Sequence, residues 1–269
     1  MIYMYLDPRW IILIASTSIA FSSLSPIVTV RKLNFFASAL PHASLLSIAL
    51  GYMLSAITGV DPTTLAIVIS VPLSFLQMYL VQRGVDENIA TSVFVAFTTS
   101  ASVAAMYYIL TKFPAQVSLW SYILGDPLLS TWSDVAYALA VSAAVAALSL
   151  VLYRKEVLIG VDRDYAMLIG LNVRLHDYAV VALLTVASVG LLRVVGFVLE
   201  HVVLLLPSAI AVSIARNSGD VLWISIAVSV LSGVIGLMVA LALDIAPSAA
   251  FGLTLFAVYL VALARGGKG

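Results

Sequence analysis

Residues 31–55 read RKLNFFASALPHASLLSIALGYMLS, and this stretch decides the fold class. A basic pair opens it, and more than twenty mostly apolar or small residues follow, which is the length of a membrane-spanning helix. His42 interrupts the apolar run. An ionisable side chain at membrane depth costs free energy, so by default it indicates a transport pathway. The stretch therefore predicts a transmembrane helix with a functional histidine.

The composition extends this conclusion to the whole chain. Apolar residues make up 63% and charged residues 10% of its 269 residues, and the mean hydropathy is +1.14, which excludes a soluble globule. The short alternating strands of a membrane barrel are not seen. Zero net charge excludes a nucleic-acid partner, and the lack of cysteine excludes disulfides, thiolate metal sites and cysteine nucleophiles.

The apolar runs predict an all-α, polytopic bundle of eight or nine transmembrane helices, which we treat as a single membrane domain over residues 1–269. The candidate helices are 10–30, 33–57, 63–81, 89–111, 133–153, 177–193, 196–215, 221–243 and 248–264. With the N-terminus outside, most basic residues fall on the inner face: Arg31, Lys32, Arg83, Arg154, Lys155, Arg163, Arg174, Arg216, Arg265 and Lys268. Only Arg9, Lys112 and Arg193 then lie outside. Because cytoplasmic loops are enriched in Lys and Arg, the C-terminus is expected in the cytoplasm.

Small residues recur every four positions in two of these helices. The second carries Ala43, Ser47, Gly51, Ser55 and Gly59, and the eighth carries Ser232, Gly236, Ala240 and Asp244. This spacing lets helix backbones approach closely in lipid, so it predicts tight helix packing.

The segment 154–176 is the longest expected inside the cell, and it is too short to be an ATPase. Asp162 to Asp164 open a helical pattern that ends at Gly170, as helices commonly do at glycine. The pattern predicts a compact helix on the inner surface. From the residues alone, it is either a contact element for another protein or a plain interfacial helix.

Several motifs, in order along the chain, resemble one known family. Phe35-Phe36-Ala37-Ser38-Ala39-Leu40-Pro41-His42-Ala43 resembles the pattern FFGDALSHA, and further matches are Asp86–Ala90, Asp164 through Ala166 to Gly170, and Val195-Gly196 through Leu206-Pro207-Ser208-Ala209. Together they resemble the ABC-3 family, the permease subunits of zinc, manganese and iron ABC importers.

This resemblance implies an architecture and a set of partners. It implies a type II ABC importer-like permease in the cell membrane of a prokaryote, with two copies of the chain forming the pathway. Two separate ATPase chains would bind ATP and dock on residues 154–176, with Asp164, Ala166 and Gly170 in the coupling helix. A solute-binding protein would deliver the cargo from outside. The chain itself would bind no cofactor and catalyse no reaction.

The resemblance also points to a metal site, with one departure. Family members that import metals carry an aspartate four residues before the histidine, and Ser38 stands there in this chain. Glu200 and His201, five residues into the seventh predicted helix, are the remaining ionisable groups at plausible depth. We therefore expect His42, Glu200 and His201 to contact a divalent metal ion in transit.

Each of these residues also has a structural interpretation. His42 can be a neutral histidine that is hydrogen-bonded to a neighbouring helix, and Glu200 can pair with Arg193. His176, beside Asp177 at a helix start, is expected to be a solvated cap.

The leading hypothesis is the permease of an ABC importer for zinc or manganese. One alternative keeps the ABC architecture and changes the cargo to a chelated metal or an organic compound. Another is a single-chain secondary carrier that uses Glu200, Arg193 and the histidines as a proton relay, although no inverted repeat supports it. An intramembrane enzyme is disfavoured because no nucleophile with a base is visible.

Overall fold

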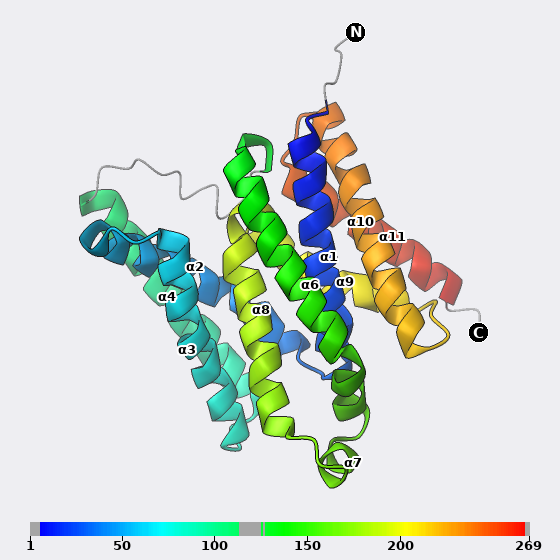
Figure 1. Ribbon diagram of the computed structural model, residues 1–269. Helices are drawn as coiled ribbons and strands as arrows, with labels where there is room; N and C mark the ends of the chain where they lie inside the picture. The colour runs from blue at the N-terminus through cyan, green and yellow to red at the C-terminus, as the bar shows by residue number, and fades with distance from the viewer. Residues whose placement is uncertain (1–5, 113–124, 126, 267–269) are drawn as a thin grey trace.

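The computed structural model describes residues 6–112, 125 and 127–266, and its regular elements there are all helices. In chain order they are α1 (Pro8–Val30), α2 (Asn34–Thr58), α3 (Pro62–Gln82), α4 (Glu87–Lys112), the 3₁₀ turn η1 (Pro127–Leu129), α6 (Trp132–Val161), α7 (Arg163–Leu168), α8 (Val173–Val195), α9 (Phe197–Val212), α10 (Ser218–Leu243) and α11 (Pro247–Gly266). Figure 1 shows them as a bundle with α7 at one end. The predicted all-α fold is confirmed.

All nine predicted membrane helices are present, with one difference in length that matters. Eight of the described helices are long and apolar enough to cross a membrane, whereas α9 has 16 residues and is shorter. The other departure is α6, which continues to Val161 instead of ending near residue 153. Its apolar residues resume at Val157, after Arg154, Lys155 and Glu156, so the helix carries on beyond these charged residues.

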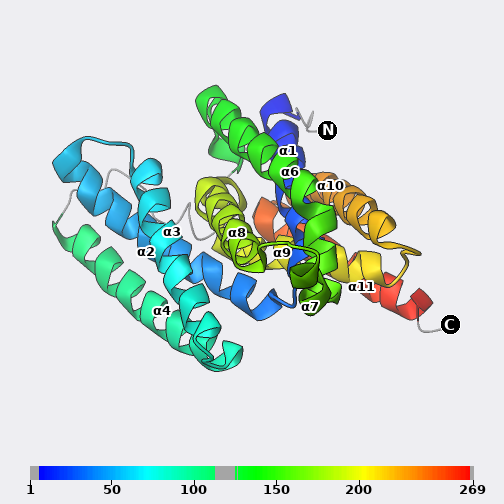
Figure 2. The same cartoon turned by 60° about the horizontal axis from the view of Figure 1, so that its bottom comes forward.

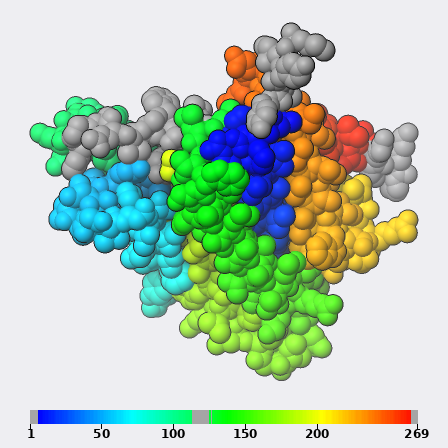
Figure 3. Space-filling view, turned by 45° about the horizontal axis from the view of Figure 1, so that its top comes forward, coloured from blue at the N-terminus to red at the C-terminus, as the bar shows by residue number. Residues whose placement is uncertain are grey.

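The centre of the bundle is formed by α1, which packs against α6, α9 and α10. Most of α1 and α8 is buried, whereas α4 is mostly exposed. Helix α8 lies between two groups of helices, with α2, α3 and α4 on one side and α1, α6, α9, α10 and α11 on the other (Figure 2). In the space-filling view the α2–α4 group projects to one side of α1 and α6 (Figure 3).

Small hydroxyl side chains join the central helices. The Ser23 and Ser149 hydroxyls are 2.8 Å apart and link α1 to α6. The Thr29 and Ser208 hydroxyls are 2.5 Å apart, and the Ser208 backbone N–H donates to Ser25 Oγ at 3.1 Å, so α9 is tied to α1 twice. Interhelical hydrogen bonds of this kind help association where lipid offers no hydrophobic driving force.

The small-residue stripes do bring backbones together. A Cβ atom added at Gly51 would lie 2.5 Å from the Pro62 carbonyl oxygen of α3, and one added at Gly236 would lie 2.5 Å from the Phe251 Cα of α11. Both contacts are with backbone atoms that cannot swing aside. Close packing, predicted from the spacing, is therefore confirmed at these two positions.

One end of the bundle holds most of the Lys and Arg residues. The α7 end holds the turns between α1 and α2, between α3 and α4, and between α9 and α10, with the basic residues Arg31, Lys32, Arg83, Arg154, Lys155, Arg163, Arg174 and Arg216. The opposite end holds Arg9, Lys112 and Arg193. The residues Asp126 and Lys268 and the side chain of Arg265 lie outside the described part of the chain.

Candidate functional site

His42 lies in the ninth position of α2, about 12 Å along the helix from its start at 1.5 Å per residue. Its ring is half-buried. The Nδ1 atom is 2.9 Å from the Thr99 hydroxyl of α4, which is the contact with a neighbouring helix that a structural role predicts. The Nε2 atom makes no hydrogen bond within the described residues, so this contact leaves one ring nitrogen for a ligand.

His201 lies beside His42, although 159 positions separate them in the sequence. The ring centroids are 5.8 Å apart, and Phe197 of α9 contacts both rings at 4.8 and 5.1 Å. The Nδ1 atom of His201 is 2.9 Å from the Phe197 carbonyl oxygen. Since a carbonyl only accepts, Nδ1 carries the proton, and the lone pair of a neutral ring is on Nε2, as in many metal-bound histidines.

Glu200 points to a different part of the bundle. Adjacent helical residues point about 100° apart, and the Glu200 side chain is fully buried against α8. There the Ser188 hydroxyl donates to Glu200 Oε1, and Ser188 lies 2.9 Å from the Ser44 hydroxyl of α2. Glu200 Oε2 has no partner within the described part of the chain.

The three predicted ligands therefore do not converge within one chain. Among the described residues, no group of three His, Cys, Asp or Glu side chains is placed to hold a metal ion. The structure brings His42 and His201 together and leaves Glu200 apart, joined to their neighbourhood through Ser188 and Ser44. Ser38, at the position of the family aspartate, donates its hydroxyl proton to the Phe35 carbonyl oxygen at 2.6 Å.

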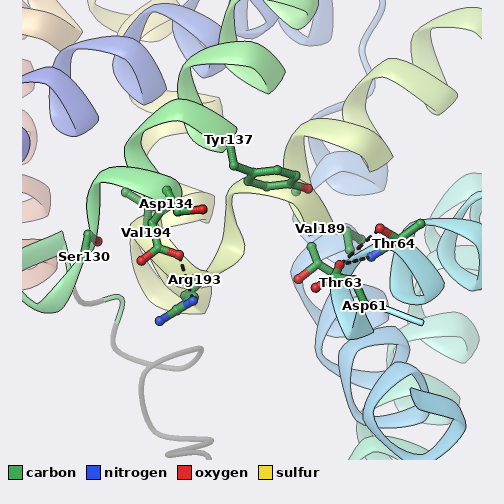
Figure 4. Close-up of a pocket in the computed structure, with 11 residues that line it drawn as sticks. Asp61, Thr63, Thr64, Ser130, Asp134, Tyr137, Val189, Arg193 and Val194 are labelled. Atoms are coloured by element: carbon green, nitrogen blue, oxygen red, sulfur yellow. Dashed lines mark hydrogen bonds and ion pairs between the residues drawn. The ribbon is translucent and has the colours of Figure 1, made fainter. Parts of the chain in front are cut away.

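The pairing of Glu200 with Arg193 is wrong. Arg193 Nη1 lies 2.9 Å from Asp134 Oδ1 of α6, at the end of the bundle opposite α7. This ion pair lines one side of a cavity of about 330 Å³ between α3, α6 and α8, with Asp61 on the other side and the Tyr137 ring of α6 between them (Figure 4). Asp61 in turn accepts a hydrogen bond from the Thr64 backbone N–H at 2.8 Å. A relay from Glu200 to Arg193 has no support in this geometry.

The predicted short helix on the basic end is present as α7. The Asp162 side chain caps it by accepting from the Tyr165 N–H at 2.8 Å. At its other end the Gly170 N–H donates to the Met167 carbonyl and the Leu171 N–H to the Ala166 carbonyl, which is a Schellman motif. Gly170 has φ +87°, a conformation that glycine adopts without strain.

The two faces of α7 differ in exposure. Ala166 is fully buried, in a small apolar cluster with Ile159 of α6 and Val173 of α8, so the helix is seated on the bundle. The next residues, Met167, Leu168 and Ile169, are 51%, 84% and 52% exposed. The helix is therefore seated on the bundle through Ala166 and exposes the apolar residues 167–169 at the end of the bundle, the bottom in Figure 1.

His176 is not the solvated cap that its position predicted. Its Nδ1 atom lies 2.6 Å from Glu156 Oε1, and the Glu156 side chain is fully buried. Helix α8 is capped instead by Asn172, which accepts from the Leu175 N–H at 3.1 Å. Glu156 went unnoticed in the sequence, although a carboxylate one turn before the end of an apolar helix was a signal for a buried partner.

Comparisons with known proteins support the motif-based resemblance. A model of the ABC 3 transport family matches residues 5–266. The chain is 23% identical to the manganese transport system membrane protein MntC of Listeria innocua, over 93% of this chain and 88% of that one. It is 24% identical to the manganese import system permease protein ScaB of Streptococcus parasanguinis, over 87% of this chain and 81% of that one.

The fold is also found among solved structures. It is similar to a chain of PsaBC from Streptococcus pneumoniae in complex with Fab, with a TM-score of 0.82. The sequence identity is 21%, and the match covers 94% of this chain and 89% of that chain.

Proposed function

The chain belongs to the ABC 3 transport family, and from this membership we propose that it is the membrane permease of an ATP-driven importer for a divalent transition metal, manganese or zinc. The manganese permeases to which it is similar support this class of cargo. The eight long apolar helices and the family place the chain in the plasma membrane. The preponderance of Lys and Arg at the α7 end supports a cytoplasmic location for that end and for the C-terminus.

The observation that carries the cargo assignment is the pair His42 and His201. Two half-buried imidazoles, 5.8 Å apart between centroids, come from α2 and α9 at membrane depth. Imidazole nitrogen is a ligand for zinc, iron and other first-row transition metals. Two ligands from one chain bind weakly, which suits a transfer site that must release its ion. A second copy across the pathway would complete the coordination.

The remaining parts of the importer are assigned to other chains. We propose that an ATPase binds ATP and docks on α7, where the exposed Met167, Leu168 and Ile169 need a partner to cover them. A solute-binding protein would deliver the ion at the opposite end, where the carboxylates of Asp61 and Asp134 line the cavity of Figure 4. Because Arg193 pairs with Asp134, the carboxylate of Asp61 leaves one net negative charge among these lining residues, which attracts cations.

The test is metal uptake by the permease reconstituted with its ATPase and solute-binding protein. We expect His42→Ala and His201→Ala each to abolish uptake of radioactive manganese and zinc, because each removes a ligand. Met53→Ala, a change on α2 three turns beyond His42, is the matched control and should leave uptake intact. Normal uptake by both histidine variants would overturn the metal site. Uptake of a metal chelate but not of the free ion would assign the cargo to the chelated class.

A further inference from the structure

Charged side chains from the end of α1 and from α6, α7 and α8 meet where α7 adjoins the bundle. The members of this α7-side charge cluster are Arg31 after α1, Glu156 of α6, Arg163 of α7, and His176 and Asp177 of α8. Arg31 Nη1 lies 2.6 Å from Glu156 Oε2, and Arg31 Nη2 contacts Asp177 Oδ1. Arg31 therefore bridges a carboxylate of α6 and one of α8.

Asp177 is the junction between this bridge and α7. Its second oxygen, Oδ2, lies 2.6 Å from Arg163 Nη2. The same oxygen accepts from Gln82 Nε2 of α3 at 3.3 Å. One carboxylate thus joins the short cytoplasmic helix to the end of α1, to α3 and to α8.

Burial divides the cluster into a fixed part and an accessible part. The side chains of Arg31, Glu156 and Asp177 are 4%, 0% and 3% exposed. The Arg163 side chain is 53% exposed, because it reaches Asp177 from the surface. Arg163 is also the only member carried by α7, the element that we propose to seat the ATPase.

The charges balance only while Arg163 is in place. Two guanidinium groups offset two carboxylates, and His176 is the remaining titratable group that faces them. If Arg163 moved away, a buried group with net negative charge would remain, and uncompensated buried charge is strongly unfavourable. The position of α7 is therefore linked energetically to the packing of α1, α6 and α8.

We propose that Asp177 is a positioning residue for energy coupling, which transmits displacement of α7 to the membrane helices through its bond to Arg163. The inference rests on the proposed docking of an ATPase at α7. Arg163 acts as a tether that makes α7 move together with α8 and the end of α1. Without the tether, α7 would move with the ATPase while the helices stay behind.

The test compares two neighbouring arginines in the reconstituted importer. Arg163→Gln removes the charge that meets Asp177 and keeps most of the side-chain length. Arg174→Gln is the matched control, since Arg174 is exposed near the same segment and has no ion pair within the described residues. We expect Arg163→Gln to lower the metal ions imported per ATP hydrolysed by at least about fivefold, the low end of typical coupling between sites. The number of ions imported per ATP should be intermediate in Arg163→Lys, between the parent and Arg163→Gln. In Arg174→Gln this number should equal that of the parent.

A crosslink separates this inference from the proposed function. The chain has no cysteine, so Leu168→Cys places one thiol at the exposed tip of α7 for a thiol–amine crosslinker to reach the ATPase. A crosslink that persists in Arg163→Gln while transport per ATP falls supports the tether. The tether is overturned if the crosslink persists in Arg163→Gln and transport per ATP is unchanged. It is also overturned if transport per ATP falls equally in Arg174→Gln. Loss of the crosslink only in Arg163→Gln also overturns it, because Arg163 would then bind the ATPase directly. No crosslink from Leu168→Cys in the otherwise native chain overturns docking at α7 itself.

Discussion

Gly236→Ala is expected to destabilise the bundle although it adds a single methyl group. The new Cβ would lie 2.5 Å from Phe251 Cα and 2.8 Å from Phe251 N, both backbone atoms of α11. Helices α10 and α11 would have to separate, and overpacking of this kind costs about 1–3 kcal/mol. Alanine offsets up to about 1 kcal/mol of this by its better helix propensity. Because the 2.5 Å contact is with backbone, the overpacking cost lies in the upper part of that range, about 2–3 kcal/mol, which leaves a net loss of about 1–2 kcal/mol in the free energy of unfolding.

Gly252 provides a control with the same chemistry on the facing helix. A Cβ added there would find its nearest atom at 3.7 Å, in the Val202 side chain, which is ordinary van der Waals contact. Only the propensity effect remains, so Gly252→Ala should raise the free energy of unfolding by about 0.5–1 kcal/mol. The two variants should therefore move stability in opposite directions.

The measurement is reversible unfolding of the purified chain in mixed micelles, followed by the fluorescence of its four tryptophans. The parent and both variants are titrated with SDS under the same conditions. If Gly236→Ala is as stable as the parent, or cannot be separated from Gly252→Ala, then the α10–α11 contact is not held by backbone approach and the argument from the glycine fails.

Two further predictions concern function. Gly170→Val should lower transport-coupled ATPase activity and leave membrane insertion intact. The reason is that φ +87° is strongly disfavoured for a β-branched residue, so the end of α7 must rearrange. Normal transport-coupled ATPase activity in this variant would show that α7 is only an interfacial helix. Ser38→Asp should raise manganese uptake relative to zinc, because it adds an oxygen ligand one turn before His42 and manganese favours oxygen. In the parent and in Ser38→Asp, uptake should fall at acidic pH, because a protonated imidazole has no lone pair with which to bind the ion. An unchanged manganese-to-zinc ratio at pH 7.5 would contradict the role of position 38.

Features set by local sequence were predictable. The start and end of α7 follow from Asp162 and Gly170, since a side-chain cap and a positive φ are properties of a few consecutive residues. The helices were visible as apolar runs for the same reason. The end of α6 was missed because its apolar residues resume after a basic pair, and only packing against α7 and the next turn decides where it stops.

Features set by distant contacts were not predictable from one sequence. Arg31 was assigned only to a membrane face, because its partner Glu156 lies 125 positions away. Adjacent helical residues such as Glu200 and His201 point about 100° apart, and which of them faces His42 depends on how α9 is rotated against α2 and α8. The hydrogen bond from Ser188 and the contact with Phe197 settle that rotation.

The shortness of α9 has a consequence for the bilayer itself. Sixteen residues span about 24 Å at 1.5 Å per residue, less than the ~30 Å hydrocarbon core. A helix that is too short for its membrane forces the lipid to thin beside it or leaves its ends below the surface. Helix α8 has 23 residues and passes into α9 through the single residue Gly196, so the turn between them lies at the end of a helix long enough to cross the core, and the shortfall falls at the other end of α9, at Val212. His201 lies about one turn into α9 from that turn, so the thinned part of the low-dielectric layer lies between the histidine pair and the α7 end of the bundle.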